Sequence, residues 1–322
     1  MTDSKYTRQT VTEVREWVPG KLFSLRVTRD PAFQFKAGQF ARVGLPESPE
    51  PGAPPTLWRA YSMVSGPLDD ELEFYSIVVP DGAFSPRLAA LRPGDALYVE
   101  KNPYGFLTID RFFPVEGGPA GGEPAAGEPA AGDPAAGEPA AGDGGRGPAI
   151  GDAAATAARR HGPGTRDDPA PAPDLWLLAT GTGLSAYLSI LRDPATWRRF
   201  RRLIVVHGVR TADELAYRQE IEGWSSLPEF AAIHAADPRK LIYRAVTTRE
   251  PLPDTPQARL TTLLADGSLE TLVGERLDPA HSRVMLCGNP EMLAEARKIL
   301  ATRGFAPGRR GIPGNLAVEN YW

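Results

Sequence analysis

The sequence predicts a two-domain protein, an antiparallel β-barrel followed by an α/β domain built on a parallel sheet. Three observations support this fold class. Between residues 22 and 101, apolar and polar side chains alternate at the period of half-buried strands. Residues 121–145 consist of five-residue repeats such as "AGEPA", which separate the two halves of the chain. After residue 173, buried strands alternate with helices, as in sheets with helical crossovers.

The first domain, expected at residues 1–115, contains about six short strands and one helix, which is typical of a small antiparallel barrel. In "LFSLRVTR", Phe23, Leu25 and Val27 share one face and polar side chains share the other. Ser85 is expected to be the N-cap of the helix, with Pro86 at its first position. The strands that can be delimited are residues 22–29, 38–45, 58–65, 72–79 and 95–101.

An acidic insertion is expected at residues 116–173. It contains nine acidic residues and four arginines, so it carries a charge of −5, and the rest of the chain, whose total is −4, carries +1. Because it is rich in Gly, Pro and Ala, it buries too little apolar surface to offset its ordering entropy, and we expect it to be disordered. A stiff spacer is the alternative, since its prolines recur regularly.

The second domain, expected at residues 174–322, has the sequence rhythm of a nucleotide-binding α/β fold. Its length and the 42% hydrophobic content of the chain are sufficient for a core in each domain. Strands are expected at residues 174–180, 202–209, 241–248 and 283–289, and helices at residues 184–193, 212–224, 257–267 and 290–304.

The composition excludes several classes of protein. A single cysteine, Cys287, excludes an internal disulfide, a Cys-ligated zinc site and an iron–sulfur cluster of the chain's own, and we expect no metal. The polar N-terminus and the lack of an apolar stretch of about 18 residues predict a cytoplasmic protein without a membrane span. We also expect no nucleic-acid partner and a monomeric state.

A glycine-rich turn follows the first strand of the second domain, in "LLATGTGLSAYLSIL". Gly181 and Gly183 would let the backbone approach a pyrophosphate, and the helix expected from about Leu184 would offer free N–H groups. The motif lacks the complete G-x-G-x-x-G spacing, so simple helix packing stays open as the alternative.

Arginines follow the next strands, where an enzyme that prefers NAD usually has an acidic residue. Arg210 ends "VVHGVR", Arg249 lies in "VTTRE" and Arg259 in "QARL". Guanidinium groups suit a 2′-phosphate, which they bind with charge-assisted hydrogen bonds. Taken singly, each arginine can also be an ordinary solvated surface charge.

In the first domain, the strand "WRAYS" places Arg59 and Tyr61 on the same side, as if to hold a phosphate and an aromatic ring system together. The helix start in "DGAFSPRLAAL" can also hold a phosphate, although plain helix capping is the more common role.

Seven motifs in one order resemble the bacterial ferredoxin–NADP reductases, within the plant-type ferredoxin reductase superfamily. They are "RAYS", "FYSIVVPDGAFSPRLAALRPGD", "ATGTGLSAYLSIL", "HGVRTADELAY", "TREP", "MLCGNPEML" and the final "VENYW". The resemblance implies FAD and NADP(H) as cofactors. The residues that it implies for FAD are Arg59, Ala60, Tyr61, Ser62, Tyr75, Ala83, Phe84, Ser85 and Thr182, and those for NADP are Gly181, Gly183, Arg210, Arg249, Arg259, Gly288 and Asn289.

The same resemblance implies the catalytic residues. Ser62, Cys287 and Glu319 would surround the nicotinamide. In similar reductases the terminal aromatic residues fold back onto FAD, so Tyr321 would cover the flavin opposite Tyr61 and Trp322 would stack on the adenine.

The function implied is hydride transfer between NADPH and FAD, followed by one-electron transfer to ferredoxin or flavodoxin. Alternatives are a free flavin reductase, the reductase component of an oxygenase, and a nucleotide-binding regulator without turnover. Because such carriers are acidic, a docking face of basic residues is expected. Its candidates are Arg87, Arg92, Arg297, Lys298, Arg303, Arg309 and Arg310, and scattered solvated charge is the alternative.

Overall fold

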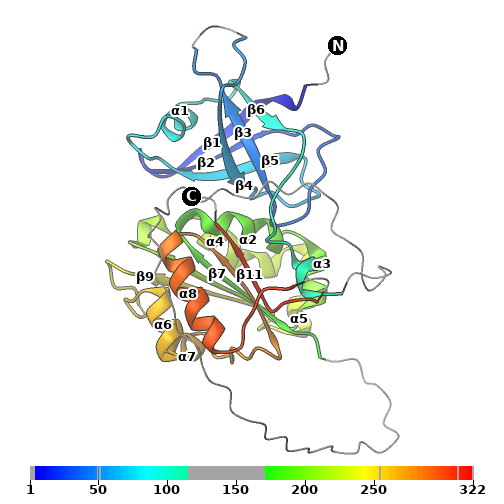
Figure 1. Cartoon of the computed structure of the whole chain (residues 1–322), viewed down its shortest axis with the longest axis vertical. Coiled ribbons are helices and arrows are strands. Elements are labelled where there is room, and N and C mark those ends of the chain that lie inside the picture. The colour runs from blue at the N-terminus through cyan, green and yellow to red at the C-terminus, as the bar shows by residue number, and fades with distance from the viewer. Residues whose placement is uncertain are drawn as a thin grey trace, which may run out of the picture. The chain divides into compact units, whose positions relative to one another are not determined.

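The fold is described from a computed structural model, which describes residues 4–48, 50, 52–114, 171–253, 255–309 and 312–320. These residues belong to one compact unit (Figure 1). Most of the acidic insertion and both terminal aromatic residues, Tyr321 and Trp322, lie outside them. Within the described ranges, no helix is both long and apolar enough to cross a membrane, and no three potential metal ligands cluster.

The first domain is a six-stranded antiparallel sheet that curls on itself, as predicted. Its order is β4-β3-β6-β1-β2-β5, and an antiparallel bridge between Met63 and Phe74 brings the two edge strands together. Phe23, Leu25 and Val27 are all buried inside it. The elements are β1 (Tyr6–Val18), β2 (Leu22–Thr28), β3 (Phe40–Leu45), β4 (Leu57–Ser62), β5 (Glu71–Ile77), α1 (Ser85–Ala89), β6 (Ala96–Glu100) and the 3-10 turn η1 (Ile109–Phe112).

The longest strand, β1, was not delimited by sequence periodicity. Of its 13 residues, only Gln9 and Val11 are fully buried, so it lacks a run of alternating apolar side chains. Pairing with β2 on one side and β6 on the other stabilises it instead. These partners become visible only when the whole sheet is assembled.

The N-cap predicted for Ser85 is wrong. Helix α1 begins at Ser85 itself, and its N-cap is Phe84, which makes no side-chain capping bond. The Ser85 hydroxyl accepts a hydrogen bond from the backbone N–H of Val79 at 2.8 Å. Ser85 therefore ties α1 to the segment after β5.

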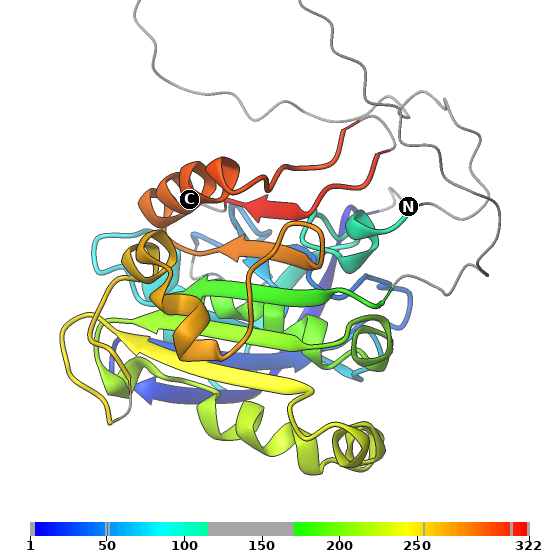
Figure 2. The same cartoon turned by 90° about the horizontal axis from the view of Figure 1, so that it is seen from below.

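The second domain is a five-stranded parallel sheet of order β11-β10-β7-β8-β9 with helices on both faces (Figure 2). This confirms the predicted fold class. Its strands are β7 (Asp174–Thr180), β8 (Leu203–Val209), β9 (Leu241–Thr247), β10 (Ser282–Cys287) and β11 (Leu316–Glu319). The helices are α2 (Leu184–Leu191), α3 (Pro194–Arg199), α4 (Arg218–Gly223), α5 (Pro228–Ala236), α6 (Leu260–Asp266), α7 (Ser268–Val273) and α8 (Pro290–Thr302). The 3-10 turns are η2 (Gly181–Gly183), η3 (Ala212–Glu214) and η4 (Trp224–Ser226).

The helix expected at residues 212–224 is interrupted at Tyr217, which adopts a left-handed φ of 61°. Its ring is buried between Trp17 and Tyr75 of the first domain, at centroid distances of 4.5 and 5.3 Å. Its hydroxyl donates to Glu73 at 2.6 Å. Contacts with the first domain thus outweigh the local helical preference.

The order of the second sheet positions the nucleotide loops. Strand β7 lies in the middle, the chain continues to β8 and β9 on one side, and β10 and β11 add on the other. Ligands of such sheets bind at the carboxyl ends of the strands where this reversal occurs. The loops after β7 and β10, which begin at Gly181 and Gly288, meet at this point.

Candidate active site

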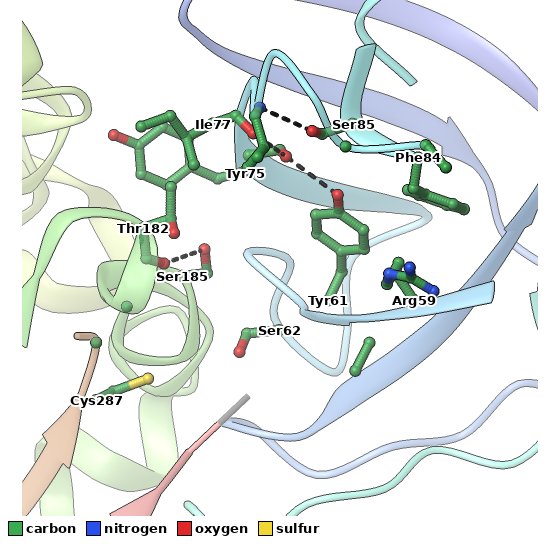
Figure 3. A pocket seen from close by; sticks show the side chains of 17 residues that line it. Arg59, Tyr61, Ser62, Tyr75, Ile77, Phe84, Ser85, Thr182, Ser185 and Cys287 are labelled. Carbon is green, nitrogen blue, oxygen red and sulfur yellow. Dashed lines mark hydrogen bonds between the residues drawn. The ribbon is translucent and has the colours of Figure 1, made fainter. Parts of the chain in front are cut away.

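One cavity of about 360 Å³ lies between the two domains, within the size range of small-molecule sites (Figure 3). It brings together most of the residues that the resemblance implied for FAD and for the nucleotide turn. Its lining comprises Arg59, Ala60, Tyr61, Ser62, Tyr75, Ser76, Ile77, Val79, Gly82, Ala83, Phe84, Ser85, Thr182, Gly183, Ser185, Cys287 and Gly288.

Strands β4 and β5 form the wall from the first domain. Arg59 and Tyr61 line the cavity, and their side chains leave β4 on the same side, as strand alternation requires (Figure 3). Ser76 donates a hydrogen bond to the Tyr61 hydroxyl at 3.2 Å, and burial raises the pKa of Tyr61. Arg59 has no acidic partner among the described residues and bonds only to the carbonyl of Trp58, at 2.8 Å. Its guanidinium charge is therefore available to an anion.

Tyr75 contributes a buried aromatic side chain to the same wall. It is 2% exposed, and its hydroxyl has no hydrogen-bond partner in the part of the chain that the structure describes. Burial raises the pKa of Tyr75, so the phenol stays neutral at ordinary pH. A buried hydroxyl without a partner costs free energy unless a ligand satisfies it.

The glycine-rich turn η2 forms the opposite wall. Gly181 has a φ of +54°, and its carbonyl lies 3.0 Å from Nε2 of the fully buried His207. Burial lowers the pKa of His207 to about 4, so the imidazole is neutral and donates its Nε2 proton to this carbonyl. The turn runs directly into helix α2, whose first backbone N–H, that of Leu184, donates to the carbonyls of Gly181 and Thr182, and no side chain caps the turn, so N–H groups for a ligand would come from the turn itself.

The loops after β7 and β10 are fastened together. The Thr180 hydroxyl accepts the backbone N–H of Asn289 at 2.9 Å. Gly288 has a φ of +136°, and a Cβ there would approach Thr180 Oγ1 to 2.2 Å, so only glycine fits. The Asn289 side chain caps α8 by accepting the N–H groups of Glu291 and Met292.

Of the predicted catalytic residues, Ser62 and Cys287 line the cavity. Burial, and secondarily the charge of Glu319, raises the pKa of Cys287, so its sulfur is a neutral thiol. Glu319 does not line the cavity. It pairs with Cys287 across β10 and β11, and its carboxylate accepts the backbone N–H of Phe106 at 3.0 Å.

The three arginines predicted for a 2′-phosphate follow β8 and β9 and lie outside the cavity. The backbone N–H of Arg249 donates to the carbonyl of Arg210 at 2.8 Å, and Arg259 is the N-cap of α6. Among the described residues, none of the three has an acidic partner within ion-pair distance. The backbones of the three arginines lie at the carboxyl end of the sheet, because they follow β8 and β9 and the segments that carry them are joined there by hydrogen bonds.

The structure divides the candidate docking residues. Arg297 and Arg309 line a groove together with Arg111, whereas Arg303 forms an ion pair with Glu270 at 2.9 Å. In the first domain, Arg87 and Arg92 donate to backbone carbonyls and do not line this groove. Lys298 lies on α8 outside the groove, and Arg310 lies outside the described residues.

Several residues of the site were not individually expected from the sequence. Ser76, Ile77, Val79 and Gly82 line the cavity, and all four lie inside the motif "FYSIVVPDGAFSPRLAALRPGD", so the signal was present. Ser185 lines it as well and donates to the carbonyl of Thr182 at 2.8 Å. No signal in the sequence indicated that His207 holds the carbonyl of Gly181 and is not simply a buried side chain.

A cavity between an antiparallel domain and a parallel-sheet domain, with a glycine-rich turn at the point of strand reversal, is the arrangement of a two-domain nucleotide-binding protein. Consistent with this class, residues 177–298 match the model of the oxidoreductase NAD-binding domain family.

Relatives along almost the whole chain identify the family. The chain is 35% identical over 315 residues to ferredoxin–NADP reductase A of Sorangium cellulosum, covering 98% of this chain and 89% of that one. It is 33% identical to the ferredoxin–NADP reductase of Pseudomonas aeruginosa, covering 98% and 96%. A crystal structure of a ferredoxin NADP+ reductase from Neisseria gonorrhoeae with bound FAD and NADP has a TM-score of 0.73 and 26% identity, and the comparison covers 99% of this chain and 100% of that one. The chain belongs to the ferredoxin–NADP reductase family.

Proposed function

We propose that this protein is an FAD-dependent ferredoxin/flavodoxin–NADP reductase. The observation that carries the proposal is that Arg59, Tyr61 and Tyr75 of the first domain line the same cavity as Thr182 and Cys287 of the second. Bound FAD would supply the chemistry, because it can take a hydride from NADPH and release electrons singly to a carrier. The FAD-binding domain would span residues 1–115 and the NADP-binding domain residues 174–322.

The residues of the first domain fit FAD in three respects. The guanidinium of Arg59, which has no acidic partner among the described residues, suits the pyrophosphate. The ring of Tyr61 suits stacking on the flavin, and Tyr75 adds aromatic surface to the same wall. Residues 83–85 complete this wall, with Phe84 centred 5.9 Å from the ring of Tyr61. The cavity thus offers aromatic surface and one cation, as a flavin nucleotide requires.

The second domain fits NADP(H). Gly181 has open space beside its Cα and would permit close approach of the pyrophosphate, whereas Gly183 and Gly288 allow the loops after β7 and β10 to pack against each other. The N–H groups of the turn η2 would serve the same ligand. Arg210, Arg249 and Arg259 would bind the 2′-phosphate. Asn289 would contribute through its loop, since its side chain already caps α8.

Ser62 and Cys287 would contact the nicotinamide as neutral groups. The raised pKa of Cys287 keeps its proton on sulfur, so no thiolate repels the hydride in transit or attacks the ring. Glu319 would act from behind Cys287, because it is paired with Cys287 across β10 and β11 and its carboxylate accepts the backbone N–H of Phe106. Together these residues would position the ring and exclude water without taking up a charge.

The electron acceptor would be an acidic carrier. The relatives include proteins named flavodoxin/ferredoxin–NADP reductase, among them that of Escherichia coli, which is 32% identical over 313 residues. Arg111, Arg297 and Arg309, which share a groove, would contribute to docking. The monomeric state, the cytoplasmic location and the stacking of Tyr321 and Trp322 on FAD stay predictions.

The test is an anaerobic titration of the FAD-loaded protein. We expect NADPH to bleach the flavin absorbance and the reduced protein to pass electrons to ferredoxin or flavodoxin. Bleaching followed by transfer only to free flavin would identify a flavin reductase instead. A bound flavin that NADPH does not bleach would show a regulator without turnover and would refute the proposal.

A further inference from the structure

We propose that Glu214 is a positioning residue for NADP selectivity, which aims Arg210 at the 2′-phosphate, and that Lys21 of the first domain neutralises its charge. This inference rests on the proposed function, because it assumes that Arg210 meets the 2′-phosphate. It assigns a task to two residues that do not line the cavity, and it connects the first domain to nucleotide selectivity.

The carboxylate of Glu214 makes two contacts. Its Oε2 accepts the backbone N–H of Arg210 at 3.0 Å, and its Oε1 forms an ion pair with Nζ of Lys21. The side chain of Glu214 is 10% exposed, so water competes little for the hydrogen bond to Arg210, whereas the side chain of Lys21 is 37% exposed. A charge-assisted hydrogen bond in such surroundings is stronger than one at the surface.

The Arg210 backbone is thereby fixed at both of its polar groups. Glu214 holds the N–H, and the carbonyl accepts the N–H of Arg249 at 2.8 Å. Glu250 extends the same arrangement by accepting the N–H of Ala212 at 2.7 Å. With its peptide units fixed, the exposed side chain of Arg210 leaves the loop in a defined direction and loses less freedom when it binds a phosphate.

Lys21 lies in the turn between β1 and β2. Its backbone is held by two hydrogen bonds, from its N–H to the carbonyl of Val18 at 3.0 Å and from the N–H of Val78 to its carbonyl at 2.8 Å. A carboxylate beside a phosphate site repels the ligand unless a cation compensates it. Lys21 supplies that cation from a rigid part of the other domain, 193 residues away in the sequence.

A purely electrostatic role and a positioning role of Glu214 predict opposite changes in the affinity for a 2′-phosphate when Glu214 is removed. If Glu214 acted only through its charge, its removal would strengthen the binding of a 2′-phosphate. If it acts by holding Arg210, its removal weakens that binding. The sign of the change therefore identifies the mechanism.

The experiment measures binding to the FAD-loaded protein by calorimetry, with adenosine 2′-monophosphate as the probe and adenosine 5′-monophosphate as the reference. We expect E214A to bind the 2′-phosphate about tenfold more weakly and the ratio of kcat/KM for NADPH over NADH to fall by about the same factor. E214Q, which keeps an oxygen acceptor for the N–H of Arg210, should retain most of the affinity. K21M should weaken binding of the 2′-phosphate because it leaves the carboxylate uncompensated.

D213N is the matched control, since Asp213 is exposed, carries the same charge and lies on the same loop. It should leave the affinity unchanged or slightly increased. Unchanged or tighter binding in E214A would overturn the inference, and so would unchanged binding in K21M if E214A does not fold. Wild-type protein that does not prefer the 2′-phosphate over the 5′-phosphate would instead refute the proposed function, and the inference with it.

Discussion

The buried His207 makes the stability of the protein depend on pH. Replacing this one residue separates its contribution from that of the other titratable groups. Its pKa is lowered from the ordinary value of 6.5 to about 4 by burial. Below pH 6.5 the unfolded chain binds a proton at this residue, while the folded protein does not. The folded state therefore loses stability as the pH falls from 6.5 to 4.

The magnitude follows from the gap of about 2.5 between the two pKa values. Between pH 7.5 and pH 4.5, His207 should remove about 2.5 kcal/mol from the free energy of unfolding. The groups that face it are the Gly181 carbonyl at 3.0 Å, the Tyr243 hydroxyl at 3.5 Å and the more remote charge of Glu214. The hydrogen bond to Gly181 and, to a smaller extent, the charge of Glu214 oppose the lowering of the pKa, and burial outweighs both.

The assay is urea unfolding of wild type and H207Q, both saturated with FAD, at several pH values from 4.5 to 7.5. At pH 7.5 the variant should be less stable, because the geometry of the bond to Gly181 changes. Toward pH 4.5 the difference in the free energy of unfolding between wild type and variant should shrink by about 2.5 kcal/mol, since the variant cannot bind the proton. H281Q, which removes an exposed histidine, is the control. A difference that stays constant over this pH range would refute the assignment of a buried neutral imidazole.

Three further predictions concern the cofactors. Replacing Arg210 and Arg249 by Ala should cost about 1.5–3 kcal/mol of NADPH binding per residue and shift the preference toward NADH, and unchanged NADPH kinetics would contradict their assignment. Gly288→Ala should weaken NADP⁺ binding at least tenfold and lower the melting temperature, because its Cβ would overlap Thr180; a neutral effect in calorimetry would count against the close loop contact. Removing residues 321–322 should tighten NADP⁺ in titrations of the flavin spectrum, improve NADH turnover and weaken FAD retention by roughly tenfold. If all three measurements stay unchanged, the two rings do not cover the cofactor.

Local patterns in the sequence were sufficient for the fold class and for much of the cavity. Strand alternation in "WRAYS" predicted that Arg59 and Tyr61 share a side, and Figure 3 shows both side chains on the same side of β4 at the cavity. The turn after β7 was evident from its glycines, because the φ of +54° at Gly181 is a left-handed conformation that residues other than glycine rarely adopt. Both features depend on neighbours within a few residues, which a single sequence displays directly.

What the tertiary structure decided depends on partners that are far apart in the chain. Periodicity did not delimit β1, because its stability comes from two neighbouring strands more than from its own apolar residues. Tyr217 interrupts a segment with helical pattern, because its ring is buried against the other domain.

The role of Glu214 is of the same kind. Its sequence context "ADELAY" resembles an ordinary acidic helix start, and Lys21 lies 193 residues away. An acidic side chain becomes a selectivity element only when folding places it between a cation of one domain and a backbone N–H of the other. Local sequence fixes conformational preferences, whereas burial and electrostatic pairing depend on distances that exist only in the folded chain.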